Sequence, residues 1–283
     1  KGENKMKTYA SLHCHTDHSN ASCGFPDSIN KVSDSINLAL SLGFSGYAIT
    51  DHECVSGHVK ALNYIKELRQ KTEEKINLSK SEEEKINAIK YLEKLNNFKV
   101  ILGNEAYLSR SDLTKETYQK GERFNHIILL AKDKVGHKQL RKLSSKAWER
   151  AFMRAIMRRY NILEDFDEII GEDKGHLIMT TACIGGVLGN YFMNMLGPDA
   201  IAAANNYIQY MQDVFGYDNF YVELAPGDGD QVEYNKWLYN NFYGKVKFTM
   251  ATDAHYGSKE DFEIFKTFLN SKDTKDREVE AFY

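Results

Sequence analysis

The chain has 283 residues, of which 42% are hydrophobic, and a formal net charge of −3. This length can bury one large α/β core or two small ones, and the presence of only three prolines argues against long linkers. The near balance of charge excludes a global attraction to nucleic acid or to an anionic membrane, so any such binding must use a local patch.

Cysteine usage and hydropathy indicate a reducing compartment. The four cysteines show neither C-x-x-C pairs nor the spacing of a disulfide framework, and we therefore expect a cytoplasmic location. No apolar run is long enough to cross a bilayer, and the polar residues 1–5 do not resemble a signal peptide. No membrane partner is expected.

The chain begins with the pattern of a strand followed by a helix. A strand is predicted over residues 9–13 and a loop over residues 16–26. Asp27 or Ser28 is then expected to cap a helix that ends at Gly43.

A second strand at residues 46–50 delivers Asp51 and His52 at its carboxyl end, which completes a βαβ unit with parallel strands. The next forty residues, 55–97, predict a helical hairpin, part of it an insertion on the rim of the domain. Ser81, followed three residues later by a glutamate, is typical of the start of its second helix.

The third and fourth strands have different patterns. The third, at residues 99–102, leads to Glu105, and the polar residues 109–123 are expected to form a loop. The fourth, at residues 127–131, is a continuous apolar run, which is typical of a parallel strand buried on both faces.

A long helix is predicted over residues 135–160. Basic side chains recur on it every four residues and form one positive face, which either meets phosphates of a nucleic acid or is an ordinary solvated face. These five residues are Lys142, Lys146, Arg150, Arg154 and Arg158.

The last part of the chain continues the alternation of strands and helices. Strands are expected at 177–181, 220–224 and 246–251, and helices at 199–215 and 259–269. Cys183 follows the first of these strands, and Asp253 and His255 follow the last. Seven strands alternating with helices predict a (β/α) barrel in one domain, in which functional residues lie at the carboxyl ends of the strands.

Possible metal ligands gather at these strand ends. His13 and His15 are two residues apart on a strand, so both imidazoles point to one face and can reach one ion. Taken alone, each histidine is more often a hydrogen-bonded core residue, and Cys183 a small buried hydrophobe. Their joint placement favours a metal site. Its candidate ligands are His13, His15, His52, Glu105, His126, Cys183, Asp253 and His255, with a carboxylate from the first loop.

Imidazole and carboxylate ligands together suit Zn, Mn or Fe in a multinuclear site. Such a cluster clamps a phosphate and activates water near neutral pH, which implies phosphoester hydrolysis. Asp51 is a candidate for orienting a neighbouring ligand. His18, His58, His137 and His176 lack this placement, and we expect ordinary structural roles for them.

Several motifs together resemble those of the polymerase and histidinol phosphatase (PHP) domain. The motifs are Leu12-His13-Cys14-His15-Thr16, Ala48-Ile49-Thr50-Asp51-His52 and Asp253-Ala254-His255-Tyr256. More narrowly, residues 102–105, 125–132, 136–140 and 182–186 resemble the PHP domain at the start of bacterial DNA polymerase III alpha subunits. The resemblance covers residues 8–270 and leaves 271–283 as the start of a linker.

This resemblance implies a distorted seven-stranded TIM-like barrel with a trinuclear site of nine ligands. Eight ligands carry over by motif. The ninth is an aspartate after the His-x-His, where the commonest spacing meets Ser22, and Asp27 matches a variant with a longer loop. The implied cofactors are two to three divalent ions of Zn, Mn or Fe, with Mg as a further candidate, and His13, His15, Glu105, Asp253 and His255 form the catalytic set.

Members with all ligands resemble metal-dependent 3′–5′ exonucleases, so the implied function is proofreading-type hydrolysis of DNA 3′ ends. The implied partners are the rest of the polymerase alpha chain and other replisome subunits. A polymerase core cannot fit in this length, so the chain is expected to be an N-terminal piece that does not polymerise DNA by itself. The alternatives are a histidinol-phosphate phosphatase and a catalytically silent structural module of the polymerase.

Overall fold

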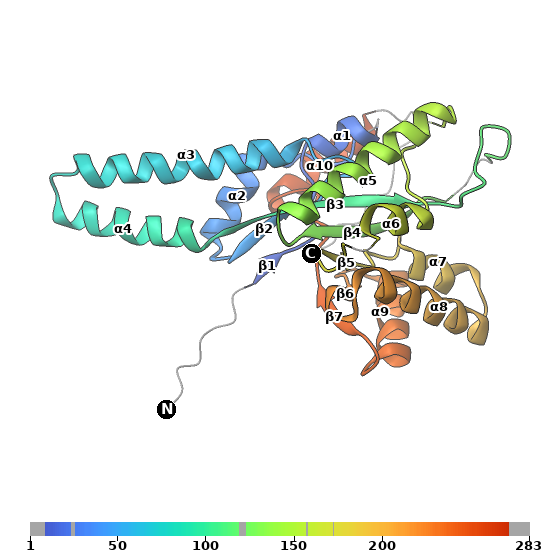
Figure 1. Ribbon diagram of the computed structural model, residues 1–283. Coiled ribbons are helices and arrows are strands. Elements are labelled where there is room, and N and C mark those ends of the chain that lie inside the picture. Colours follow the sequence, from blue (N-terminus) through green and yellow to red (C-terminus); the bar gives the residue numbers. More distant parts are fainter. Residues whose placement is uncertain (1–8, 24–25, 119–122, 157, 172, 272–283) are drawn as a thin grey trace.

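In the computed structural model, seven strands form one sheet, and their order in the sheet is their order in the sequence (Figure 1). The structure describes residues 9–23, 26–118, 123–156, 158–171 and 173–271. The strands are β1 (Ala10–Ser11), β2 (Gly46–Ile49), β3 (Lys99–Leu108), β4 (Asn125–Ala131), β5 (Leu177–Thr180), β6 (Phe220–Leu224) and β7 (Lys247–Met250).

Helices cover the outside of this sheet (Figure 1). In the described part of the chain they are α1 (His18–Cys23), α2 (Val32–Ser41), α3 (Gly57–Leu78), α4 (Glu82–Asn97), α5 (Lys134–Met153), α6 (Leu163–Ile170), α7 (Val187–Asn194), α8 (Gly197–Phe215), α9 (Gly229–Phe242) and α10 (Phe262–Asn270). None of the described helices is long and apolar enough to span a membrane.

The two edges of the sheet meet, so the predicted barrel is confirmed. Cys14, just after β1, forms a parallel bridge with Ala254, just after β7. The His15 amide donates to the Ala254 carbonyl (2.9 Å), and the Ala254 amide donates to the His13 carbonyl (3.2 Å). The segments that carry candidate ligands therefore close a distorted seven-stranded barrel themselves.

The direction predicted for the fourth strand is wrong. β4 runs antiparallel to both of its neighbours, β3 and β5. A continuous apolar run shows that a strand is buried but not which way its partners run, and the described residues between β3 and β4 contain no crossover helix. As a result, the first residues of β4 lie at the same end of the barrel as the carboxyl ends of the parallel strands.

The segment between β1 and α2 also differs from the prediction. Part of the expected loop is helix α1, and α2 begins after Lys31 rather than after Asp27 or Ser28. Ser28 instead donates its hydroxyl to the carbonyls of His15 and His255, each at 2.9 Å. It thereby links the segment after β1 to the segment after β7. The predicted stop at Gly43 is confirmed, with φ of +76°.

The helical hairpin predicted for residues 55–97 is present as α3 and α4, which project from the barrel (Figure 1). Ser81 accepts a hydrogen bond from the Glu84 amide, as expected of a helix N-cap. Leu95, Ile65 and Ala61 at the inner end of the hairpin are buried against β2, while Leu78 at the tip is exposed.

Two element lengths were mispredicted. β3 continues to Leu108 because its second half pairs with β4, and α5 ends at Met153 rather than near residue 160. Helices α6, α7 and α9 were not predicted. The charged tail from residue 272 onward lies outside the described residues.

Candidate metal centre

The His-x-His segment has the alternation expected of extended backbone. His13 and His15 are fully buried on the inner side of the barrel, whereas Cys14 between them packs in the core formed with α2 and β2. The Thr50 hydroxyl accepts from the Cys14 amide (2.8 Å) and holds this segment beside the end of β2.

The structure brings seven of the nine predicted ligands into two adjoining groups that share His15. One group contains His15, Asp27, His52 and His255, and the other contains His13, His15, Glu105 and Asp253. Within each group the ligand atoms lie within 4.8 Å of one another. The longer first loop carries Asp27 into the cluster, which favours Asp27 as the ninth ligand.

Asp27 reaches the cluster because the loop around it is fixed by Asn20. The Asn20 side-chain carbonyl accepts from the amides of Asp27 (2.8 Å) and Ser28 (2.9 Å). One Asp27 oxygen then lies 3.3 Å from Nε2 of His52 and 3.5 Å from Nε2 of His255.

Glu105 lies at the centre of the site. One of its oxygens is 2.9 Å from Nε2 of His15 and 2.8 Å from Nδ1 of His52, and the other is 2.7 Å from Nδ1 of His126. Glu105 lies inside β3 and His126 near the start of β4, not at carboxyl ends of strands as predicted. The antiparallel direction of β4 explains why His126 still reaches the site.

His126 and Cys183 lie beside the two groups rather than within them. His126 contacts Glu105, and the Cys183 sulfur accepts from the Gly185 amide at 3.4 Å. A Cβ atom at Gly185 would lie 3.3 Å from the His126 ring and 3.5 Å from that sulfur, so glycine leaves room for both side chains.

Hydrogen bonds outside the cluster orient three of its imidazoles. Nδ1 of His13 lies 2.8 Å from the Glu223 carboxylate, and Nδ1 of His255 lies 2.9 Å from the Asp253 carbonyl. Nδ1 of His15 lies 3.0 Å from the Ser19 hydroxyl. In the neutral form of each ring Nδ1 is then the N–H donor, and Nε2 is left to present its lone pair to a metal ion at the centre, as in proteins whose histidines bind metals.

The predicted orienting role of Asp51 has a geometric basis. Its carboxylate is fully buried and accepts from the Ser19 hydroxyl (2.9 Å) and from the Thr16 amide (2.6 Å). Because the single Ser19 proton goes to Asp51, the Ser19 oxygen is left to accept from His15 and from the His52 amide (3.2 Å). Asp51 thus orients His15 through Ser19.

Sequence reasoning missed Glu223. It lies in β6, buried, and its second oxygen accepts from the Thr180 hydroxyl at 2.5 Å. The sequence shows Glu223 as the one charged residue within the apolar run of β6. A charged side chain in a strand can face either solvent or the barrel interior, so this pattern alone did not identify it.

The cluster is strongly coupled electrostatically. Burial alone would lower the pKa of His13, yet the Asp253, Glu223 and Glu105 carboxylates raise that pKa well above its usual value. Burial would likewise lower the pKa of His255, but Asp27 and Asp253 raise it to about 9. Burial, reinforced by Asp253 and Glu105, raises the pKa of the Cys183 thiol.

Strained backbone also concentrates here. Among the described residues other than glycine, four have positive φ, and three of them adjoin or belong to the cluster: Glu53 (+45°), Ala182 (+57°) and Asp253 (+49°). Such conformations cost about 1–3 kcal/mol each and persist where the surroundings hold them, commonly at functional sites.

Several buried polar atoms in this site make no hydrogen bond of regular geometry and face one another as close imidazole–carboxylate pairs, an arrangement that fits divalent ions. They include Nε2 of His13 and of His15, both oxygens of Glu105, and one oxygen each of Asp27 and Asp253. Two ligands of one tetrahedral ion at ordinary bond lengths lie about 3.3 Å apart. The 3.1 Å and 3.2 Å separations of Asp253 from His13 and His15 match this spacing.

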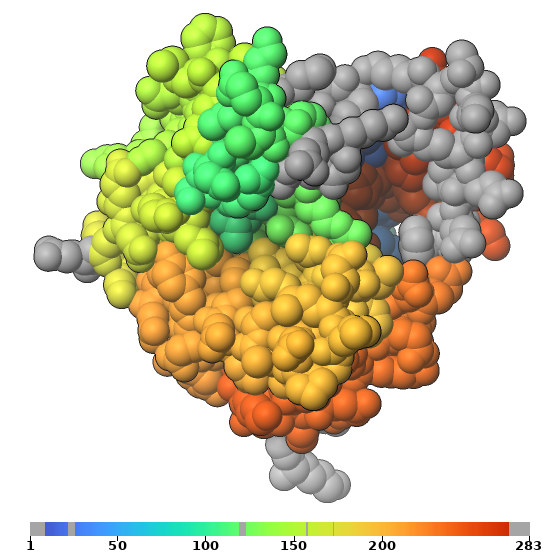
Figure 2. Space-filling view, turned by 90° about the vertical axis from the view of Figure 1, so that its right-hand side faces the viewer, coloured from blue at the N-terminus to red at the C-terminus, as the bar shows by residue number. Residues whose placement is uncertain are grey.

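One side of the cluster is open. The side chains of Asp253 and His126 are 25% exposed and that of His255 is 21% exposed, whereas those of His13 and His15 are fully buried. Figure 2 shows a hollow beside the green β3–β4 region, with blue N-terminal and red C-terminal segments at its bottom. A ligand would therefore approach from the side of Asp253, His126 and His255.

The remaining histidines have structural partners, as expected. His18 bonds to Ser56 (2.8 Å), and His176 to Asp133 (2.6 Å). His58 donates to the Gly103 carbonyl (2.7 Å) and accepts from His137 (3.1 Å).

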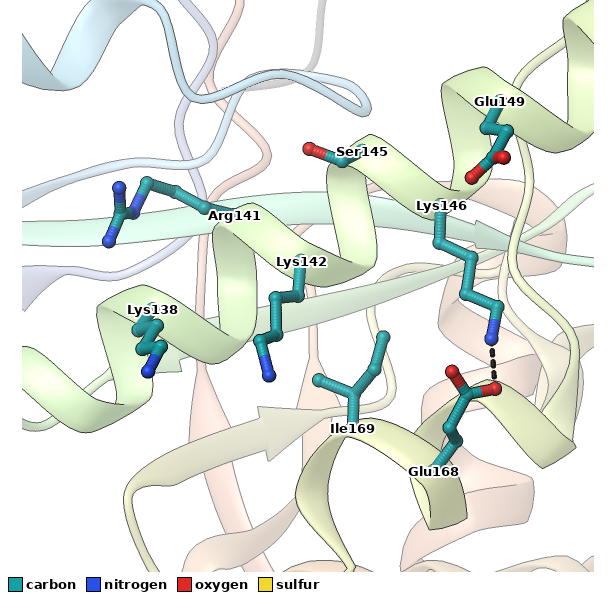
Figure 3. Close-up of a pocket in the computed structure, with 8 residues that line it drawn as sticks. All are labelled: Lys138, Arg141, Lys142, Ser145, Lys146, Glu149, Glu168 and Ile169. Atoms are coloured by element: carbon teal, nitrogen blue, oxygen red, sulfur yellow. Dashed lines mark hydrogen bonds and ion pairs between the residues drawn. The ribbon is translucent and has the colours of Figure 1, made fainter.

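The five predicted basic residues do not form one helical face. Arg150 makes a bidentate ion pair with Asp165, at 2.6 Å for each bond, and Arg154 donates to the Leu113 carbonyl beyond the end of α5. Lys142 and Lys146 line a groove of about 560 Å³ between α5 and α6, where Lys146 pairs with Glu168 (Figure 3). Arg158 lies after α5, with its guanidinium carbon 5.6 Å from the ring centroid of Tyr107.

Comparisons with known proteins agree with this geometry. A family model described as "PHP domain" matches residues 11–226. The chain is 35% identical to the probable DNA polymerase YorL of Bacillus subtilis (strain 168), over 96% of this chain and 20% of the relative. It is 32% identical to the DNA polymerase III subunit alpha of Borreliella burgdorferi, over 88% of this chain and 18% of the relative. The chain thus spans about a fifth of the length of these relatives.

Among solved structures, similarity extends to a protein from Bifidobacterium adolescentis provisionally assigned as a metal-dependent phosphoesterase. The identity is 14%, the TM-score 0.48, and the coverage 89% of this chain and 90% of that one.

Proposed function

The chain belongs to the PHP domain family, and we propose that it is the PHP domain of a DNA polymerase III-type alpha subunit that hydrolyses phosphodiesters at DNA 3′ ends with two to three bound divalent ions. The observation that carries this proposal is the set of seven imidazole and carboxylate side chains that converge at one end of the barrel in two groups, with the ligand atoms of each group within 4.8 Å of one another. A purely structural core would not gather so many ionisable groups, because burying them costs more free energy than burying apolar side chains of similar size.

We assign the holding of these ions to nine residues: His13, His15, Asp27, His52, Glu105, His126, Cys183, Asp253 and His255. Divalent ions bound there would act as Lewis acids and would lower the pKa of a bound water molecule toward neutrality. The protein holds the Nε2 atoms of His13, His15 and His255 toward the centre of the site. It does so by giving the Nδ1 atom of each ring a hydrogen-bond partner. Glu105, which contacts four histidines, would help to hold ions bound among them.

The substrate follows from the similarity to DNA polymerases and from the open side of the site. A DNA 3′ end would enter past Asp253, His126 and His255, because His13 and His15 are buried on the opposite, closed side of the site. The rest of an alpha chain and other replisome subunits would be its protein partners, and the cytoplasm its location.

Two other functions remain to be separated from this one. A histidinol-phosphate phosphatase would use the same cluster on a small phosphomonoester. A structural module would keep the cluster only for stability. The similarity to polymerases over 96% and 88% of the chain favours the DNA substrate over the small one.

The first test is metal content, measured by elemental mass spectrometry on protein purified without chelator or histidine tag. About two to three equivalents of Zn, Mn or Fe per chain are expected, and none, even after added metal, would refute the proposed site. Hydrolysis of 3′ ends and of histidinol phosphate is then compared.

The variant Asp253→Asn separates catalysis from a scaffold role. Asparagine tolerates the left-handed backbone at this position (φ +49°), so the fold should persist. Loss of hydrolysis by the folded variant supports an active site. Hydrolysis unchanged from wild type, with only a lower melting temperature, would leave the scaffold role.

A further inference from the structure

One arginine is positioned next to the metal centre by aromatic rings. The guanidinium carbon of Arg158 lies 5.6 Å from the ring centroid of Tyr107 and 5.9 Å from that of Phe124. A guanidinium carries five N–H donors in its plane, so an arginine stacked on aromatic rings can bind a phosphate in addition to an acceptor within the protein.

Tyr107 connects Arg158 to the candidate ligands. Its buried ring stacks on His52, with centroids 5.2 Å apart and planes 15° apart, and its centroid lies 4.9 Å from that of His126. Tyr107 is itself fixed, because its amide donates to the Glu53 carboxylate at 2.6 Å and it lies on β3 two residues beyond Glu105. Arg158 is therefore separated from two candidate ligands by one aromatic ring.

We propose that Arg158 binds the phosphate next to the one that is hydrolysed, so that the site prefers polynucleotide ends to substrates with a single phosphate. This inference rests on the proposed function. A guanidinium suits this task because it binds phosphate oxygens in a bidentate way and keeps its charge at any physiological pH. A phosphomonoester such as histidinol phosphate has no second phosphate to bind.

The neighbouring residue provides a matched control. Arg159 carries the same charge, but its guanidinium carbon lies 4.0 Å from the Trp148 ring centroid, and Trp148 donates to the Glu53 carbonyl instead of facing the ligands. Removing Arg159 changes net charge by the same amount as removing Arg158, without touching the ring that adjoins the metal centre.

The first test is binding. A fluorescent oligothymidylate of about ten nucleotides, with phosphorothioate linkages at its 3′ end to resist hydrolysis, is titrated with the Mn²⁺-loaded 283-residue chain at several salt concentrations. Arg158→Ala should weaken binding about tenfold and reduce the slope of log K against log salt by about 0.7, as expected for one lost phosphate contact on a single strand. Arg159→Ala should change affinity less than about twofold. Equal effects of the two variants, or none from Arg158→Ala, would overturn the inference.

The second test compares substrates. Arg158→Ala should lose at least about tenfold more kcat/KM on an unmodified oligonucleotide than on bis(p-nitrophenyl) phosphate, which has one phosphate. Equal losses on both would refute a role in binding the second phosphate. Arg158→Gln, which retains much of the packing on Tyr107, should behave like Arg158→Ala if charge matters and like wild type if only packing does. Failure of the wild-type protein to hydrolyse either substrate would refute the proposed function, while the binding test would still decide the role of Arg158.

Discussion

Glu223 and His13 are joined across the barrel, with a carboxylate oxygen 2.8 Å from Nδ1 and both side chains almost completely buried. Glu223 comes from β6, and His13 follows β1, so two strands that are not neighbours in the sheet cooperate at one imidazole. The contact fixes which nitrogen of His13 faces the candidate metal centre.

Replacing Glu223 by Gln should weaken metal binding. The amide keeps an oxygen or a nitrogen near Nδ1 but removes the negative charge that supports the His13 donor, and loss of such a partner typically costs about 10- to 100-fold in metal affinity. Competition titration with a fluorescent chelator measures the change. Glu233→Gln on the exposed face of α9 is the control, and an affinity equal to wild type in Glu223→Gln would contradict the predicted role.

Replacing Ser19 by Ala should leave the His15 ring without the hydrogen-bond partner that orients it. The variant loses the acceptor of His15 Nδ1 and one donor to Asp51, both fully buried, so we expect a stability loss of about 1–3 kcal/mol and a metal affinity lowered by about tenfold. Chemical denaturation and metal titration measure these effects. Ser33→Ala, whose hydroxyl contacts only the adjacent Asp34 in the described structure, should match wild type in both.

Glu53 should make stability depend on pH. Burial raises the pKa of its carboxyl to about 8, although hydrogen bonds from the Tyr107 amide and Asn161 oppose the shift. The folded protein then holds a proton that the unfolded chain releases above its ordinary pKa of about 4.5, so stability falls as pH rises from about 4.5 to 8. The stability lost over this range is on the order of 5 kcal/mol.

The variant Glu53→Gln tests this pH dependence, because its neutral amide resembles the protonated acid. Relative to wild type, the variant should gain stability between pH 5 and pH 9, as followed by denaturant unfolding at each pH. Glu93→Gln, on the exposed face of α4, should show the wild-type profile. Parallel profiles for wild type and Glu53→Gln would show that the carboxyl titrates normally.

The α3–α4 hairpin should be stabilised at its inner end and tolerant at its tip. Leu95 is fully buried against β2, so Leu95→Ala should cost about 2–5 kcal/mol through lost burial and a residual cavity. Leu78 is 80% exposed, so Leu78→Ala should change stability by less than about 0.5 kcal/mol. If denaturant unfolding showed similar losses of unfolding free energy for the two variants, Leu78 at the tip would have to be packed against other side chains.

Local patterns were sufficient to predict much of this molecule. The spacing of His13 and His15 placed both on one face, Ser81 marked a helix start, and Gly43 marked a helix stop, because each depends only on backbone geometry within a few residues. The seven strands were also identified, since buried strands are short apolar runs wherever they lie in a sheet.

Relationships between distant segments were decided only in three dimensions. The direction of β4 depends on what it pairs with, and that pairing also extended β3 past Glu105 and brought His126 to the site. Asp27 reached His52 and His255 because α1 and Asn20 shape the loop that carries it. Glu223 had no local signal that distinguished an inward from an outward side chain.

The sequence by itself therefore determined which residue types could bind metal and on which faces of their strands they lie, because side-chain alternation follows from the extended backbone. The tertiary structure decided which of them meet, which nitrogen of each imidazole faces inward, and which arginine adjoins the site. Those features depend on hydrogen bonds and ring contacts between distant segments, as for His13 and Glu223, which are 210 residues apart, and no local pattern encodes them.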